Sequence, residues 1–150
     1  MADYEQKLAQ KKHESTLQLL FRASRLVNEE AIRRVQARTG REVRTSHTSL
    51  LPHIDLQGTR LTELARRMGV TKQAVGQLVD ELVEMGMLER IQDPEDGRGK
   101  LICFTEAGRQ EILAGLHTLQ ALEAELSVAI GPVAWQQFLT GLLGILASVG

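Results

Sequence analysis

The sequence contains 150 residues, of which 43% are hydrophobic and 25% charged, so wholesale disorder is excluded and one compact domain is expected. Aromatic residues contribute only 3%, which favours aliphatic packing between helices over a β-sandwich, and the net charge of −1 gives no general attraction for nucleic acid. No stretch approaches the roughly 20 apolar residues that span a bilayer, and the N-terminus lacks a secretory signal. A single cysteine, Cys103, suits a reducing compartment, so we expect a cytoplasmic protein without membrane partners.

The N-terminal third of the chain predicts one long helix followed by a short one. Between His13 and Arg38, apolar side chains recur at helical spacing. Gly40 ends this helix, because glycine is the usual residue just beyond a helix C-terminus. A short helix is expected from Ser46 to Ile54, interrupted near Pro52.

A helix-turn-helix is expected in residues 61–82. The first helix contains Ala65, which is small enough for a second helix to cross it closely. Gly69 supplies the residue tolerant of positive φ that the tight turn requires. Thr71 is a good N-cap for the second helix, so residues 71–84 form the candidate recognition helix.

The next segment predicts a β-hairpin and two C-terminal helices. Strands are expected at 88–91 and 100–104, joined by a polar tip that is rich in turn-forming residues. A long helix begins near Thr105, whose hydroxyl can cap it, and runs to Ile130. Pro132 opens a final helix, in which apolar side chains again recur at helical spacing.

The exposed side of the candidate recognition helix has the chemistry of a DNA-reading surface. Thr71 and the first amides of the helix can bind phosphate oxygens, and Lys72 and Arg60 can neutralise phosphates. Gln73 and Gln77 can donate and accept hydrogen bonds at base edges in the major groove. A merely solvated polar face is the alternative interpretation.

The hairpin tip carries Arg98 between two glycines. An arginine in this position can enter a minor groove, where negative potential is concentrated. Asp96 lies two residues away and could orient the guanidinium through paired hydrogen bonds, and Lys100 is a further candidate DNA-binding residue. An ordinary solvated turn with a weak surface ion pair is the alternative.

Five short runs between Leu61 and Arg109 form a set. They are Leu-Ala-Arg-Arg-Met-Gly-Val-Thr-Lys (64–72), Leu-Val-Asp-Glu-Leu (78–82), Gly-Met-Leu-Glu-Arg (86–90), Asp-Pro-Glu-Asp-Gly-Arg (93–98) and Phe-Thr-Glu-Ala-Gly (104–108). Together they resemble the winged-helix core of the MarR family of bacterial transcription regulators. The last two runs are fairly specific, whereas the helix-turn-helix is shared by many families. The flanking helices agree in order and length, so the resemblance covers nearly the whole chain.

The resemblance implies a homodimer in which N- and C-terminal helices interlock and two winged lobes face successive major grooves of a pseudo-palindromic operator. It also implies that Arg98 is the wing arginine and Asp96 its partner. Many family members have arginine where this chain has Gln77, and threonine where it has Gly76. These departures predict a preferred operator that differs from theirs.

The expected fold class is mainly α with a small β-hairpin wing, in one MarR-like domain spanning residues 1–150. Residues 45–105 form the winged helix-turn-helix lobe, and residues 10–40 and 106–150 contain the dimerisation helices. Their apolar stripes are larger than a monomer normally exposes, although packing within one chain is the alternative. The candidate interface residues are Leu17, Leu20, Trp135, Phe138, Leu142 and Leu146.

A small-molecule effector is expected at the junction of the dimer helices and the DNA-binding lobe, where effectors bind in the proteins that this chain resembles. His47 and His53 are expected to line this junction. Their i,i+6 spacing does not fit a helical metal pair, so no metal or cofactor is expected. Strand alternation places Cys103 opposite Ile102 and Phe104, so a partly exposed thiol that senses oxidants is an alternative.

Enzymatic activity is not expected. The chain has no Gly-rich phosphate loop, no nucleophile elbow and no His-Glu-x-x-His helix. The sequence therefore predicts a sequence-specific DNA-binding repressor. Two alternatives stay open: a winged-helix protein-interaction module without specific DNA binding, and a thiol- or metal-responsive sensor on the same fold.

Overall fold

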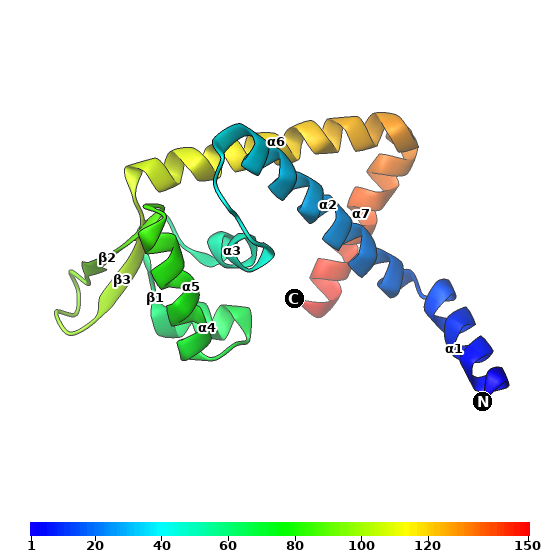
Figure 1. Ribbon diagram of the computed structural model, residues 1–150, viewed down its shortest axis with the longest axis horizontal. Coiled ribbons are helices and arrows are strands. Elements are labelled where there is room, and N and C mark those ends of the chain that lie inside the picture. Colours follow the sequence, from blue (N-terminus) through cyan, green and yellow to red (C-terminus); the bar gives the residue numbers. More distant parts are fainter.

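The computed structural model describes all 150 residues, with seven α-helices, one 3-10 helix (η1) and one three-stranded sheet (Figure 1). In chain order the elements are α1 (Ala2–Glu14), α2 (Thr16–Thr39), α3 (Thr45–Leu50), η1 (Leu51–His53), β1 (Thr59–Arg60), α4 (Leu61–Met68), α5 (Lys72–Glu84), β2 (Leu88–Gln92), β3 (Lys100–Phe104), α6 (Glu106–Ile130) and α7 (Pro132–Val149). The fold class expected from the sequence is confirmed.

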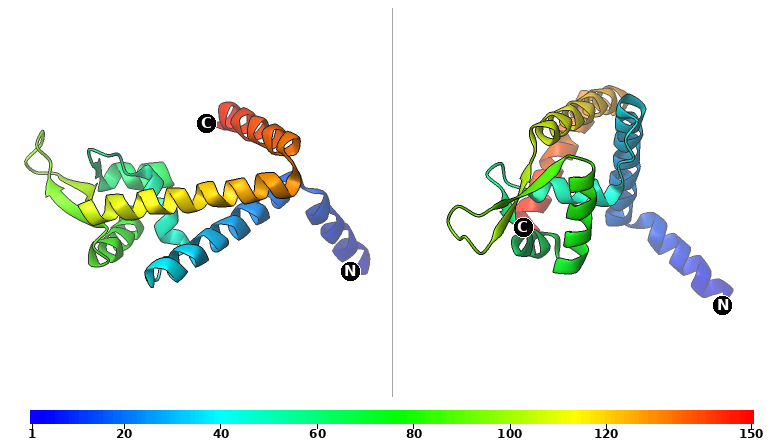
Figure 2. Two further views of the ribbon diagram at one scale, coloured as in Figure 1. Left: turned by 90° about the horizontal axis from the view of Figure 1, so that it is seen from above. Right: turned by 60° about the vertical axis from the view of Figure 1, so that its left-hand side comes forward.

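The long helix α6 organises the molecule. Its N-terminal end adjoins the winged lobe, and α7 folds back from its C-terminal end (Figure 1). Figure 2 shows α2 running alongside α6, while α1 projects away from the rest of the chain. The winged lobe therefore lies at the N-terminal end of α6, and α1 and the start of α7 lie toward its C-terminal end.

The hydrophobic core lies inside the winged lobe. Eleven buried residues from α3, the loop after η1, α4, α5, the turn before β2 and the sheet form one cluster: Leu50, Ile54, Leu64, Ala65, Val75, Val79, Leu82, Met87, Leu88, Ile102 and Phe104. Burying each large aliphatic side chain contributes about 1.5–3 kcal/mol. Outside the lobe and the start of α6, only Ala31 and Leu122 are buried, so the lobe alone has the core of an independently packed unit.

The start of α6 is fixed tightly against the lobe. The Thr105 hydroxyl accepts a hydrogen bond from the Gly108 N–H at 2.9 Å and donates one to the Gly86 carbonyl at 2.6 Å, which confirms the expected N-cap. Gly108 is buried, and a β-carbon at this position would overlap the Met87 carbonyl. Only glycine permits this close approach, so the first turn of α6 is held in one position against the lobe.

Two elements are missing from the sequence-based expectations. Helix α1 is mostly polar in sequence and buries no residue, so apolar spacing does not reveal it. Its acidic first turn and basic last turn complement the helix dipole instead. Strand β1 is only two residues long and exists because Thr59 and Arg60 pair with β3. The expected short helix also splits into α3 and the 3-10 helix η1, which contains Pro52.

Candidate nucleic-acid interface

Helices α4 and α5 form the expected helix-turn-helix. Gly69 ends α4 in the left-handed conformation, with φ of 65°. The Thr71 hydroxyl then caps α5 by accepting a hydrogen bond from the Ala74 N–H at 3.2 Å. On its inner side, α5 is anchored by Val75 and Val79, both of which are fully buried. The outer side of α5 is thereby held in a fixed orientation.

The residues expected to contact DNA gather on the outer side of α5. Thr71, Lys72, Gln73 and Gln77 are all exposed. The side chains of Lys72, Gln73 and Gln77 make no hydrogen bond within the chain, so their donors and acceptors are free. The Thr71 oxygen is used by the cap, but its O–H can still donate to a phosphate.

The wing presents Arg98 at an ordered tip. The Asp93 N–H donates to the Gly99 carbonyl at 2.9 Å, and the Gln92 amide donates to the Gly97 carbonyl at 2.7 Å. The Arg98 side chain is exposed, and its guanidinium has no protein partner. Lys100, at the start of β3, is exposed and likewise unpaired.

The structure corrects the expected pairing of Asp96 with the Arg98 guanidinium. Asp96 instead accepts a hydrogen bond from the Arg98 backbone N–H at 3.1 Å. Its other oxygen lies 3.2 Å from Nη2 of Arg60. Arg60 also donates Nε and Nη2 to one oxygen of Asp93, at 2.9 and 2.7 Å. Arg60 is therefore not a free phosphate-binding cation, because it fixes the wing to β1.

Asp93 is a structural residue that the sequence interpretation missed. It is buried, and its carboxylate accepts the Glu95 N–H at 2.9 Å, which makes an Asx-turn. That backbone hydrogen bond, followed by those from Arg60, lowers the pKa of Asp93. Its position before Pro94 signals a turn, but nothing in the sequence indicates a partner 33 residues away.

The cluster of arginines near the helix-turn-helix is mostly neutralised. Glu63 binds Arg66 at 2.6 Å and Arg67 at 2.9 Å, and these two guanidinium groups lower the pKa of Glu63 to about 2. Arg67 also binds Asp55 at 2.9 Å. The cations without a carboxylate partner on this side are thus Lys72 on α5 and the two on the wing.

Cys103 is not the partly exposed thiol expected from strand alternation. Only 6% of the residue is exposed, because the loop before β1 covers it and Gly58 lies against its sulfur. Burial, and next the Glu89 carboxylate, raises the pKa of the thiol. A buried cysteine with a raised pKa is a poor nucleophile, so the structure does not favour the oxidant-sensing alternative.

His47 and His53 do not line a shared site. His47 is buried on α3, with its Nε2 2.7 Å from Glu81 of α5, while the side chain of His53 makes no hydrogen bond. The structure places no three His, Cys, Asp or Glu side chains together for a metal ion.

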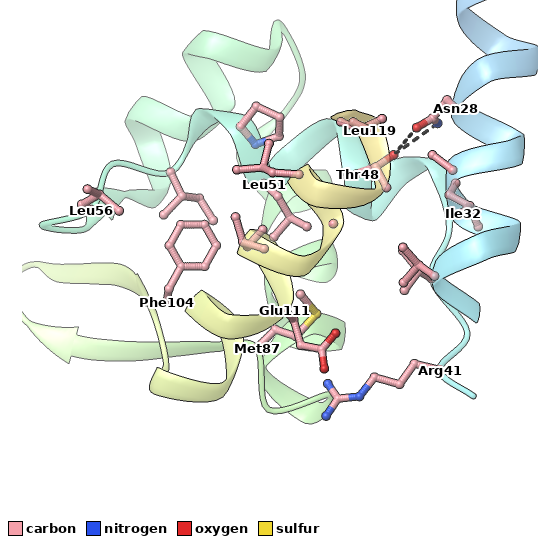
Figure 3. Close-up of a pocket in the computed structure, with 18 residues that line it drawn as sticks. Asn28, Ile32, Arg41, Thr48, Leu51, Leu56, Met87, Phe104, Glu111 and Leu119 are labelled. Atoms are coloured by element: carbon pink, nitrogen blue, oxygen red, sulfur yellow. Dashed lines mark hydrogen bonds between the residues drawn. The ribbon is translucent and has the colours of Figure 1, made fainter. Parts of the chain in front are cut away.

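A cavity of about 350 Å³ lies between α2, α3 with η1, and α6, next to the lobe. Twelve of its eighteen lining residues are hydrophobic. Figure 3 shows Arg41 and Glu111 pointing toward one another at one end. At another side, Asn28 and Thr48 are 3.3 Å apart and hydrogen-bonded. This is the junction where the sequence predicted an effector, but its lining does not include either histidine.

The candidate dimerisation residues are exposed or half-buried. Leu17 is 56% exposed, Phe138 44% and Leu146 65%. Leu20, Trp135 and Leu142 are half-buried. No residue of α7 is buried within the chain.

Helix α7 is also long and apolar enough to cross a membrane, by length and composition alone. Its 18 residues have a mean hydropathy of 1.3, and none of them is charged. The expectation that no stretch is apolar enough to span a bilayer therefore does not hold for α7 by these two criteria. Helix α7 contacts α6 but leaves most of its apolar side chains exposed, and an exposed apolar surface of this kind indicates a partner surface.

This chain is similar in sequence and in structure to known proteins. The sequence model of the MarR family matches residues 44–99, from the N-cap of α3 to the tip of the wing. An uncharacterized protein of Mycobacterium tuberculosis, Rv2011c, is 30% identical over 97 residues, covering 62% of this chain and 68% of that protein. Two Rhodococcus structures are 28% identical to the chain. CouR from Rhodococcus jostii RHA1, bound to p-coumaroyl-CoA, has a TM-score of 0.66 and covers 89% of this chain and 92% of its own. A MarR-family regulator from Rhodococcus sp. RHA1 has a TM-score of 0.65, covering 85% and 89%.

Proposed function

The chain belongs to the MarR family of transcription regulators, and we propose that it is a homodimeric repressor that binds a pseudo-palindromic operator and is released by a small-molecule effector. The observation that carries this proposal is one exposed surface, formed by α5 and the wing. It presents free amides and cations that no carboxylate neutralises. As the family is one of regulators, the expectation that the chain is not an enzyme is confirmed.

Each lobe would read one half-site. Helix α5 enters the major groove, where Gln73 and Gln77 contact base edges. Thr71 and Lys72 at its N-terminus bind the phosphate backbone and set the register. The wing places Arg98 in the adjacent minor groove, and Lys100 lies nearer the backbone.

The partner that covers the terminal helices would be a second copy of the chain. Residues 10–40 and 106–150 contribute little to the core of the lobe, yet they expose large aliphatic side chains on α2, α6 and α7. A family of regulators that binds duplex DNA through paired lobes needs two lobes held at a fixed spacing. The interlocked terminal helices supply that spacing, with Trp135, Phe138, Leu142 and Leu146 in the interface together with Leu17 and Leu20.

The effector would occupy the cavity between α2, α3 and α6. CouR, a relative of similar fold, has been solved with p-coumaroyl-CoA and, as a transcriptional repressor, with a 23-mer DNA duplex. The apolar lining here suits a hydrophobic body. Arg41 and Glu111 would orient a polar group at one end. The ligand would bind more tightly to the dimer conformation in which the two lobes are wrongly spaced for the operator. Binding would then increase the population of that conformation and release the DNA.

Selection of bound DNA from a random duplex pool tests the proposal. The expected product is one enriched inverted repeat. Affinity for it should fall steeply with salt, because each neutralised phosphate adds about 0.9 to the slope of log affinity against log salt concentration. A protein that enriches no sequence and binds all duplexes alike would contradict the proposal.

A further inference from the structure

The short helix α3 lies between the cavity and the recognition helix. Thr48 on α3 and Leu51 just beyond it line the cavity (Figure 3). His47 and Leu50, on an adjacent side of α3, are buried, and α3 packs on α5. A helix of six residues is too short to bend. If side chains in the cavity are displaced, α3 therefore moves as a unit, and its contact with α5 moves with it.

His47 makes a side-chain hydrogen bond between α3 and α5. Its Nδ1 accepts the Arg44 backbone N–H at 3.2 Å, which is part of the cap of α3. The ring must therefore carry its proton on Nε2 and donate it to Glu81, 2.7 Å away. The side chain of Arg44, the N-cap residue of α3, also bonds Glu81, so the helix and its cap together supply two donors to one carboxylate of α5.

Glu81 continues the row of residues that would read DNA. Gln73, Gln77 and Glu81 are spaced by four residues, and successive members of such a row lie on neighbouring turns of one helix side. The row is exposed at the N-terminal end of α5 and attached to α3 at Glu81. A change at Glu81 is therefore transmitted along a rigid helix to the two glutamines.

We propose that His47 and Glu81 form the link through which occupancy of the cavity repositions the recognition helix. The inference rests on the proposed function, because it assigns a route to the regulation proposed there. An occupant presses on Thr48 and Leu51, α3 shifts, and the hydrogen bond from His47 carries the shift to α5. His47 and Glu81 are positioning residues, since neither lines the cavity.

A substitution that fills the cavity serves as the occupant in the test. Gly115 of α6 lines the cavity, and a β-carbon there meets nothing within 4 Å. Gly115→Leu introduces a permanent apolar occupant and also favours the helix. Gly115→Ala is the matched control, since it gives the same helical advantage with little added volume. If Gly115→Leu does not fold, Val35→Phe fills the same cavity from α2.

Affinity for the selected operator is measured in the original background and in Glu81→Ala. In the original background, Gly115→Leu should weaken binding by at least about tenfold, within the usual range of allosteric coupling, and Gly115→Ala should not. In Glu81→Ala, the same Gly115→Leu change should cost less than about threefold. Glu81→Gln, whose oxygen still accepts from His47, should restore most of the coupling.

An equal loss in both backgrounds would overturn the link, and so would an absence of loss in the original background. Urea unfolding of each variant separates altered coupling from loss of the fold. Failure of the proposed function gives a different result, because the unsubstituted protein would then bind no operator at all.

Discussion

Single residues show which charges are available for DNA. Lys72, Arg98 and Lys100 have no carboxylate partner, whereas Arg60 and Arg67 each contact two. The sequence predicted that α5 would expose its polar side chains, because burial of the opposite apolar row dictates it. It could not predict the pairing of the arginines, because Arg60 meets acidic residues 33 and 36 positions away.

Removing the wing arginine should weaken DNA binding and leave the fold intact. Arg98→Ala should reduce operator affinity by at least about tenfold, because the free guanidinium is lost from the minor groove. Fluorescence anisotropy with a labelled operator measures the change. Arg33→Ala, on α2 and paired with Glu30, is the control and should bind normally. Unchanged affinity in Arg98→Ala would remove the wing from the DNA interface.

His47 should make the stability of the lobe dependent on pH. Burial, and then the Arg44 guanidinium, lowers the pKa of His47 below its ordinary value near 6.5. Below about pH 6.5 the unfolded chain binds a proton at this histidine that the folded chain does not bind. The free energy of unfolding is therefore highest above about pH 6.5 and decreases as the pH falls below that value. Urea unfolding at pH 7.5 and 5.5 should show this loss. His47→Gln should reduce it, and His53→Gln should not. The same loss in both variants would contradict the assignment to His47.

At the scale of elements, periodicity predicted the helices that have a long apolar row and missed the elements that lack one. The apolar rows of α5 and α7 identify these helices directly in the sequence. Helix α1 buries nothing, and β1 is formed by pairing with residues of β3 that lie 41 and 43 positions further along. Elements of this kind depend on capping charges or distant partners, neither of which leaves a repeating pattern.

Two glycines of α6 predict opposite effects of the same substitution. Gly108→Ala should lower the free energy of unfolding by about 1–3 kcal/mol, because its methyl group overlaps the Met87 carbonyl. Gly115→Ala should raise it by about 0.5–1 kcal/mol, because the site is open and alanine favours the helix. Urea denaturation of both variants measures the difference. A stable Gly108→Ala protein would show that α6 is not fixed at that contact.

At the scale of the whole molecule, the chain has one packed lobe and a set of terminal helices that bury only Ala31 and Leu122 beyond the start of α6 and leave many large apolar side chains exposed. The sequence predicted this exposure from the apolar stripes of residues 10–40 and 106–150, which are larger than a monomer normally exposes. The sequence predicted where the cavity lies but not which residues line it, because they come from α2, η1, β3 and α6. No local pattern brings those residues together.

A charge on α7 should separate the proposed dimer. Leu146 is 65% exposed, so Leu146→Asp leaves the core of the lobe unchanged but places a carboxylate in the apolar interface. Sedimentation equilibrium should show a shift from dimer to monomer at micromolar concentration. Ile91→Asp, an exposed apolar position on the wing, is the control and should stay dimeric. A dimer that survives the change in α7 would place the interface elsewhere, and binding to detergent micelles instead would favour a membrane surface.

The spacing of the two half-sites tests most directly whether paired lobes read duplex DNA. Affinity is compared between the selected operator and a version with five base pairs inserted between the half-sites, which turns one half-site to the opposite side of the helix. We expect a loss of affinity of at least about 100-fold, because a rigid dimer can then engage only one half-site at a time. Equal affinity for both duplexes would contradict it.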